Sequence, residues 1–154
     1  MATPRQILVA PGVGNYIITG NITDDAAKPG QIVTTISMTA DTANVCWPDA
    51  ANETTLGVVG CTPGHNIDTA YTTGDMAPIY VVGHGTEVWL RVVASAGAIK
   101  RGDMIESSGI TADGVAILFT DEPITVGYEK IGRAAMESPD EAVERWVKVR
   151  LTGH

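Results

Sequence analysis

Short stretches in which apolar and polar residues alternate, or in which β-branched residues run together, recur along the whole chain. Such stretches predict β-strands when Gly, Pro, Asn and Asp bound them. The pattern is clearest at 87–93, where Val88, Leu90 and Val92 fall on one face of a strand. We expect further strands at 7–10, 16–19, 31–39, 56–60, 76–82, 114–119, 128–137 and 146–151, and one that begins at Met104.

Glycine-containing turns separate these strands. The segments 24–30, 62–66 and 100–103 have strong turn chemistry, because glycine accepts a positive φ without steric cost. Gly83-His84-Gly85 predicts a hairpin turn between its flanking strands. Gly132 interrupts an apolar strand, which indicates a β-bulge or a close backbone approach. Residues 40–53 form a looser section.

Composition favours an all-β domain, because the 154 residues include 17 glycines and 8 prolines and no long runs of Leu, Glu or Lys. We predict a compact β-barrel with at most one short helix. The single helical signal is a capping box that begins at Ser138 and Pro139 and continues to Arg145. This segment could form one or two helical turns, or it could be the acidic tip of a hairpin.

The first fourteen residues differ from the rest. An apolar strand at 7–10 is followed by a break at 11–14, Pro-Gly-Val-Gly. We interpret residues 1–14 as an extended N-terminal arm and residues 15–154 as one β-domain; a frayed terminus with an edge strand is the alternative. The domain also contains a weak internal repeat, because residues 28–60 and 100–135 share the order of basic turn, Gly, strand, loop and aliphatic-Gly strand.

The charge of −8 is unevenly distributed, because no Lys or Arg occurs between Pro29 and Leu90. An acidic surface repels phosphate backbones, so we expect no nucleic-acid partner. Most basic residues follow Ile99 and mix with acids, which we interpret as ordinary solvated strand faces. No apolar run approaches the roughly 20 residues of a membrane span. The start lacks the pattern of a secretion signal, so we expect synthesis and use without translocation.

No catalytic motif stands out, and we predict no enzyme, no metal and no cofactor. Cys61, His65 and Asp68 could form a nucleophile, base and acid for a small hydrolase. Cys46, Cys61, His65 and His84 are the candidates for a zinc site, but their spacing is unlike that of structural zinc sites. Cys46 and Cys61 could form a disulfide in an oxidising compartment, or both could be reduced.

Three segments resemble a family of tailed-virus (bacteriophage-type) capsid decoration or cement proteins. Members show a turn of the type basic-x-Gly-Asp before an aliphatic strand, an aliphatic-Gly-x-Ala segment, and a closing strand that alternates Val with basic residues. The matching segments here are Lys100-Arg101-Gly102-Asp103-Met104-Ile105, Ile131-Gly132-Arg133-Ala134 and Val147-Lys148-Val149-Arg150-Leu151-Thr152-Gly153. The resemblance spans about residues 20–154, and the acid-only section at 40–74 departs from it.

The resemblance implies a β-barrel or tulip-like domain that sits as a homotrimer on the outer surface of a virion, made in the host cytoplasm. Its partner would be the major capsid protein, and it would stabilise the shell. We expect the contacts to the shell or to a neighbour to come from the arm, through Ile7, Leu8, Val9 and Val13. The alternative is a surface adhesion module that binds glycans or a host receptor through a solvent-facing Trp47.

Overall fold

The computed structural model describes residues 3–13, 17–23, 26–39, 42–48, 55–107, 115–118 and 130–152, and within them every regular element is a β-strand. The prediction of an all-β barrel is therefore confirmed. The strands are β1 (Leu8–Ala10), β2 (Ile17–Ile22), β3 (Ile32–Thr39), β4 (Thr42–Cys46), β5 (Thr55–Val59), β6 (Met76–Val81), β7 (Glu87–Val92), β8 (Met104–Ser107), β9 (Ala116–Leu118), β10 (Lys130–Ala134) and β11 (Arg145–Arg150). Among the described residues, no helix has the length and apolar character needed to cross a bilayer.

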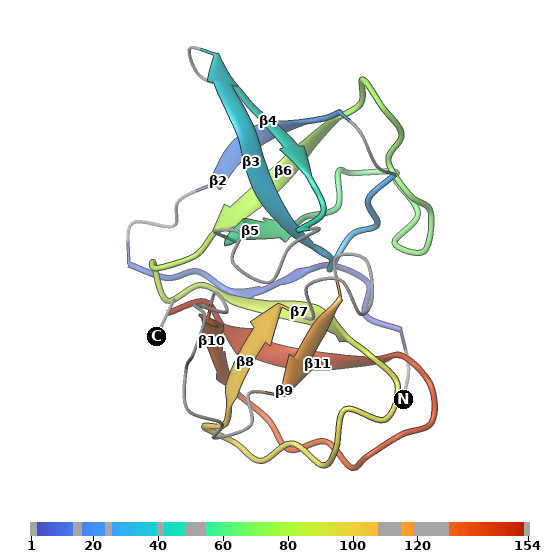
Figure 1. Cartoon of the computed structure of the whole chain (residues 1–154), viewed down its shortest axis with the longest axis vertical. Helices are drawn as coiled ribbons and strands as arrows, with labels where there is room; N and C mark the ends of the chain where they lie inside the picture. The colour runs from blue at the N-terminus through green and yellow to red at the C-terminus, as the bar shows by residue number, and fades with distance from the viewer. Residues whose placement is uncertain are drawn as a thin grey trace.

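The strands form two sheets that lie one above the other (Figure 1). Strands β2 to β6 form a closed barrel, here called the N-terminal barrel, in the order β2-β4-β3-β5-β6. Strands β7 to β11 follow the order β7-β11-β10-β8-β9, and a pairing between β7 and β9 closes them into the C-terminal ring. The short strand β1 adds to β7 and leaves one of its own edges without a partner strand among the described residues.

The two closed sheets have the same topology. In each, the first strand pairs in parallel with the third and antiparallel with the fifth. In each, the second strand pairs antiparallel with the third and fourth, and the fourth with the fifth. Strand β3 is therefore equivalent to β8, and β5 is equivalent to β10.

Identical turns lead into β3 and β8. In the turns 28–31 and 100–103, the N–H of the fourth residue donates to the carbonyl of the first residue, at 3.1 Å in both. The side-chain oxygen of the fourth residue accepts the first N–H, at 2.6 and 2.8 Å. Gly30 and Gly102 occupy the third position with φ of 86° and 94°, which L-residues with a side chain rarely adopt. Each glycine N–H then reaches the end of the equivalent strand, at Val59 O and at Ala134 O.

Glycines also sit at equivalent places in β5 and β10, where two backbones touch. A Cβ on Gly57 would lie 2.2 Å from the carbonyl oxygen of Tyr80, and one on Gly132 would lie 1.9 Å from that of Arg150. The pairing of β10 with β8 shifts register beside Gly132. The predicted bulge and close approach at Gly132 are therefore both present.

Two apolar clusters form the core. One fills the N-terminal barrel around Ile22, Val45 and Ile79. The other fills the C-terminal ring and also contains Ile32, Val58 and Tyr80 from the N-terminal barrel. The second cluster thus joins the two sheets through one face of the barrel.

Three expectations from the sequence are wrong or resolved. Residues 42–46, expected to be loose, form β4, in which Ala43 and Val45 are fully buried. The turn at 83–85 does not form a hairpin, because its flanking strands β6 and β7 belong to different sheets. The N–H groups of Gly83 and Gly85 instead both donate to Leu151 O, at 3.0 Å each. Residues 138–145 contain no helix and connect the antiparallel strands β10 and β11, as in the hairpin alternative.

Candidate interaction surfaces

The N-terminal segment lies on the chain's own C-terminal ring. The carbonyl of Ile7 accepts the N–H of Trp89 at 2.8 Å, and the Ile7 side chain is only 1% exposed within the core of the ring. Leu8 packs against the same core, and Val9 is half-buried. Val13 lies beyond the strand and is 91% exposed. Of the four predicted contact residues, Val13 is therefore the most exposed, Leu8 and Val9 are half-buried, and Ile7 belongs to the chain's own core.

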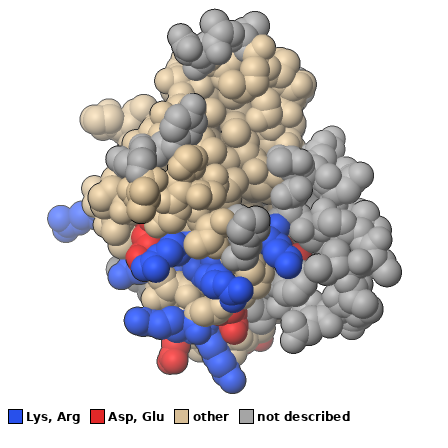
Figure 2. All heavy atoms as spheres, turned by 90° about the vertical axis from the view of Figure 1, so that its left-hand side faces the viewer, with Lys and Arg blue, Asp and Glu red and all other residues tan. Residues whose placement is uncertain are grey.

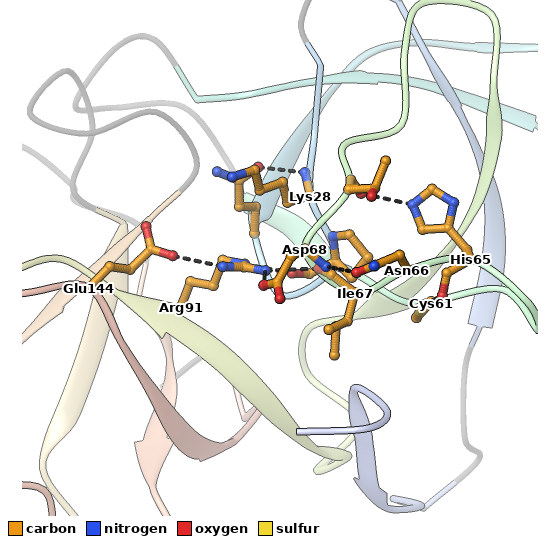
Figure 3. Close-up of polar contacts among 11 residues, drawn as sticks. Lys28, Cys61, His65, Asn66, Ile67, Asp68, Arg91 and Glu144 are labelled. Atoms are coloured by element: carbon orange, nitrogen blue, oxygen red, sulfur yellow. Dashed lines mark hydrogen bonds and ion pairs between the residues drawn. The ribbon is translucent and has the colours of Figure 1, made fainter. Parts of the chain in front are cut away.

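Arg91 holds the two sheets together from the side (Figure 3). Its side chain comes from β7 and stacks on Trp146, with the guanidinium carbon 4.2 Å from the ring centroid. Its nitrogens donate to Pro29 O at 2.9 Å and Ile67 O at 2.8 Å, both in loops of the N-terminal barrel. The guanidinium also pairs with Asp68 at 3.2 Å and with Glu144 at 2.8 Å.

This arrangement is structural. Arg91 is 5% exposed, so a buried cation is surrounded by carbonyls, carboxylates and an aromatic face, which together replace its hydration. A hollow of about 270 Å³ lies beside it, lined by Thr3, Asp68, Arg91, Glu141, Val143, Glu144, Arg145 and Trp146. The printed contacts of Arg91 are thus all made within the chain and tie β7 to two loops of the N-terminal barrel and to Glu144.

The trio of the hydrolase hypothesis is not assembled. The Cys61 thiol donates to the main-chain carbonyl of His65 at 3.2 Å, and burial raises the pKa of this thiol, which disfavours the nucleophilic thiolate. The His65 ring bonds instead to Thr69 O at 2.8 Å and stacks on Tyr71. Asp68 pairs with Arg91. Within the trio, the thiol thus meets only the main chain of His65, and the side chains of His65 and Asp68 have their partners outside it.

The cysteines are both free thiols, so the disulfide alternative is not the state of this structure. Within the described residues, no three His, Cys, Asp or Glu side chains gather as a metal site would require. Trp47 is half-buried and packs against the core of the N-terminal barrel, and its Nε1 is buried with no partner in the described part of the chain. Trp47 is therefore no open, solvent-facing platform for a sugar ring.

A basic hollow lies on the outside of the C-terminal ring (Figure 2). Its volume is about 610 Å³. Four of the chain's ten Lys and Arg side chains line it: Arg101, Arg133, Lys148 and Arg150. Figure 2 shows blue Lys and Arg atoms over the lower half of this face, with red Asp and Glu atoms among them, and no Lys or Arg is visible in its upper part. The expected mixture with acids is present, because Glu87 also lines the hollow and pairs with Arg150, but the four cations lie together at one place.

The strand pairing explains why these cations meet. Arg133 on β10 lies opposite Arg150 on β11, and Lys148 precedes Arg150 by two residues on the same face. Arg150 pairs with Glu87 at 2.8 Å, and Lys148 lies over the ring of Trp89 at 5.1 Å. In the described part of the chain, Arg101, Arg133 and Lys148 have no carboxylate within ion-pair distance. The alternation of Lys148 and Arg150 was visible in the sequence, but the cross-strand partner was not.

No family model matches the chain, and no curated protein matches it. Among solved structures, the chain is similar to the head fiber gp8.5 N base of bacteriophage phi29, at 20% identity over 88% of this chain and 92% of that chain. The TM-score of this superposition is 0.46. A likeness at this level carries no argument about fold or function, so the function is argued from the residues of the chain itself.

Proposed function

We propose that this chain is a non-enzymatic structural protein of a tailed-virus particle, which decorates the outer surface of an icosahedral capsid and stabilises it by binding across shell subunits. The resemblance to decoration proteins supports this proposal. The three segments that carry this resemblance all lie in the C-terminal ring. They are the turn into β8, the glycine-containing strand β10 and the closing strand β11.

The open edge of β1 is the observation that carries the proposal. This strand is held by β7 on one side, and its other edge has no strand beside it in the described residues. An unpaired edge accepts a strand from another chain through main-chain hydrogen bonds. Val13 lies three residues beyond the end of β1, is 91% exposed and offers a further apolar contact. A partner at the shell could therefore bind through both features.

Stabilisation would follow from mass action. A protein that binds only the assembled shell lowers the free energy of that state by RT ln(1 + [L]/Kd), which is about 2.7 kcal/mol per site at a hundredfold excess over Kd. Many copies on one particle add these contributions, and contacts across subunit boundaries act as a multivalent clamp. Modest contacts per copy are therefore sufficient.

The test uses particles of the virus that encodes this chain, prepared without it. Purified chain is added, and the bound fraction is measured by co-sedimentation and located by cryo-electron microscopy. We expect ordered density at local three-fold positions. Val13→Asp should weaken binding at least about tenfold, because burying an unpaired carboxylate is costly.

Val143→Asp is the matched control, because Val143 is also exposed but lies in the loop between β10 and β11. It should bind like the parent chain. Deleting the arm would be a poorer test, because Ile7 belongs to the core of the ring. Absence of the chain from purified virions, or equal binding by both variants, would contradict the proposal in its present form.

A further inference from the structure

The surface that carries the basic hollow has an equivalent in the N-terminal barrel. Arg133 on β10 lies opposite Arg150 on β11, and Val58 on β5 lies opposite Tyr80 on β6. Arg133 and Val58 each directly follow the glycine at which their strand touches its neighbour. Val58 and Tyr80 are therefore the equivalents of Arg133 and Arg150.

In the N-terminal barrel this surface docks another part of the protein. Val58 and Tyr80 belong to the apolar cluster that also contains Leu90 and Trp146 of the C-terminal ring. A Cβ on Gly30 would overlap the ring of Trp146, so the ring packs closely against the barrel there. The fold thus already uses this surface of a closed sheet to bind a second protein surface.

In the C-terminal ring the equivalent surface is charged. Among the described residues, four cations and one acid, Glu87, line the hollow, so three positive charges are in excess. Arg150 holds the carboxylate of Glu87 at 2.8 Å, so one carboxylate is already bound at this place. Guanidinium groups bind carboxylates through paired N–H donors, and three of the four cations are arginines. The chemistry of the hollow therefore suits further carboxylates.

The charge of the whole chain limits which anion can reach the hollow. A chain with a net charge of −8 repels a long polyanion such as nucleic acid. A short acidic segment of a protein can lie within the hollow alone, and clusters of arginines are a recurrent way to recognise such segments. The hollow therefore favours an acidic peptide segment as its ligand.

The hollow lies beside the open strand edge. Glu87 faces Ala10 of β1 on one side and Arg150 of β11 on the other, so the single strand β7 separates the two features. A clamp that crosses a subunit boundary must contact two subunits. The open edge of β1 supplies one such contact, and the hollow is a second surface of different chemistry next to it.

We propose that the basic hollow binds a short acidic segment of the shell protein, whose Asp and Glu carboxylates pair with Arg101, Arg133 and Lys148. This contact is the second one of the clamp. The proposal rests on the virion role proposed above and adds the chemistry of the partner. Because the contact is ionic, added salt weakens it, whereas strand addition at β1 depends on main-chain hydrogen bonds.

The first test uses the isolated full chain and hexaglutamate as the probe, with hexaglutamine and a thymidine hexanucleotide for comparison. Calorimetric titration measures binding. We expect saturable binding of hexaglutamate that weakens at least about tenfold between about 0.05 M and 0.5 M salt, and no binding of hexaglutamine. Absence of hexaglutamate binding, or tighter binding of the hexanucleotide, would overturn the assignment of a carboxylate partner.

Charge reversals locate the site. Lys148→Glu should weaken hexaglutamate binding at least about fivefold, because it places an acid opposite acids, and Arg133→Glu on the neighbouring strand should do the same. Lys28→Glu is the matched control, because Lys28 is exposed and lies outside the hollow, and it should leave binding unchanged. Thermal unfolding shows whether each variant is folded. Equal effects of Lys148→Glu and Lys28→Glu would overturn the assignment of the surface.

The same variants are then added to particles that lack the chain, and the bound fraction is measured by co-sedimentation. Lys148→Glu should bind at least about fivefold more weakly than Lys28→Glu. If the parent chain binds and Lys148→Glu binds equally well, this inference fails while the virion role stands. If the parent chain itself does not bind, both proposals fail.

Discussion

Arg91 and Arg150 show how differently two arginines in the same ring act. Arg91 is buried, and its donors are distributed over two loops of the other sheet. Arg150 has a largely exposed side chain, 58%, that pairs with Glu87 at the surface. Sequence reasoning treats both as polar positions on strands, because the burial of Arg91 depends on loops more than twenty residues away. The contacts of Arg91 that connect the two sheets could therefore not be predicted from the sequence pattern.

Arg91→Ala should lower the free energy of unfolding by about 3 kcal/mol, because the carbonyls of Pro29 and Ile67 lose their donor and the Trp146 face loses its cation. Urea denaturation measures this difference. Arg150→Ala is the control, and it should cost about 0–1 kcal/mol because its ion pair is solvated. A loss for Arg91→Ala as small as that of the control would show that Arg91 does not hold the sheets together.

Glu106 is a buried acid, and replacing its carboxylate by a neutral group should stabilise the protein. Burial raises the pKa of this carboxyl above the ordinary value of 4.5, while the positive charge of Lys130 lowers it by a smaller amount. Its Oε2 is buried with no hydrogen-bond partner among the described residues. Because the folded-state pKa is raised, the ionised carboxylate costs stability above that pKa, and the cost disappears as the pH falls below 4.5.

Glu106→Gln should therefore raise the free energy of unfolding at pH 7 by about 1 kcal/mol. The gain should shrink to zero as the pH falls through the carboxyl titration, since the parent residue is then also neutral. Thermal unfolding between neutral and acid pH measures both values. A gain that is equal at both pH values, or a loss at pH 7, would contradict this reading of the site.

At the scale of the element, the glycines in β5 and β10 are better predicted than the strand β4. Gly132 interrupts an apolar run, so a bulge could be predicted from the sequence alone. The sequence pattern does not predict β4, because Ala and Asn, which are depleted in strands, offset its Thr and Val, and the alternation covers only five residues. Its Asn44 is held from both sides, by Asn21 at 2.9 Å and by Ser37 at 2.8 Å, and these partners lie on β2 and β3. Tertiary pairing thus overrides weak local preference.

Gly132→Ala should destabilise the protein by about 2 kcal/mol or more, because its Cβ would overlap the Arg150 carbonyl and push β10 from β11. Gly57→Ala should behave alike at the equivalent place in β5. Gly64→Ala is the control, because open space surrounds it and only its positive φ of 83° opposes the change, at about 1 kcal/mol. Denaturation midpoints compare the three variants, and equal losses would refute a special role for the two close backbone approaches.

At the scale of the molecule, one topology used twice accounts for most of the observed features. The all-β class could be predicted from composition and strand patterns, and the turns at 28–31 and 100–103 could be located from their residues. The sequence pattern could not show that the surface around Val58 and Tyr80 is buried while the equivalent surface around Arg133 and Arg150 is open. That difference depends on which residues meet across strands. Val58 and Tyr80 pack in the apolar cluster that joins the two sheets, whereas Arg133 and Arg150 line the basic hollow.

The stabilisation of the capsid is the central claim, and the temperature at which filled particles release their DNA tests it most directly. Particles that lack the chain are heated with a dye that fluoresces on free DNA, with and without purified chain. We expect the chain to raise the release temperature, with an increase that saturates as the sites on the shell fill. An unchanged release temperature on particles that carry bound chain would contradict the claim.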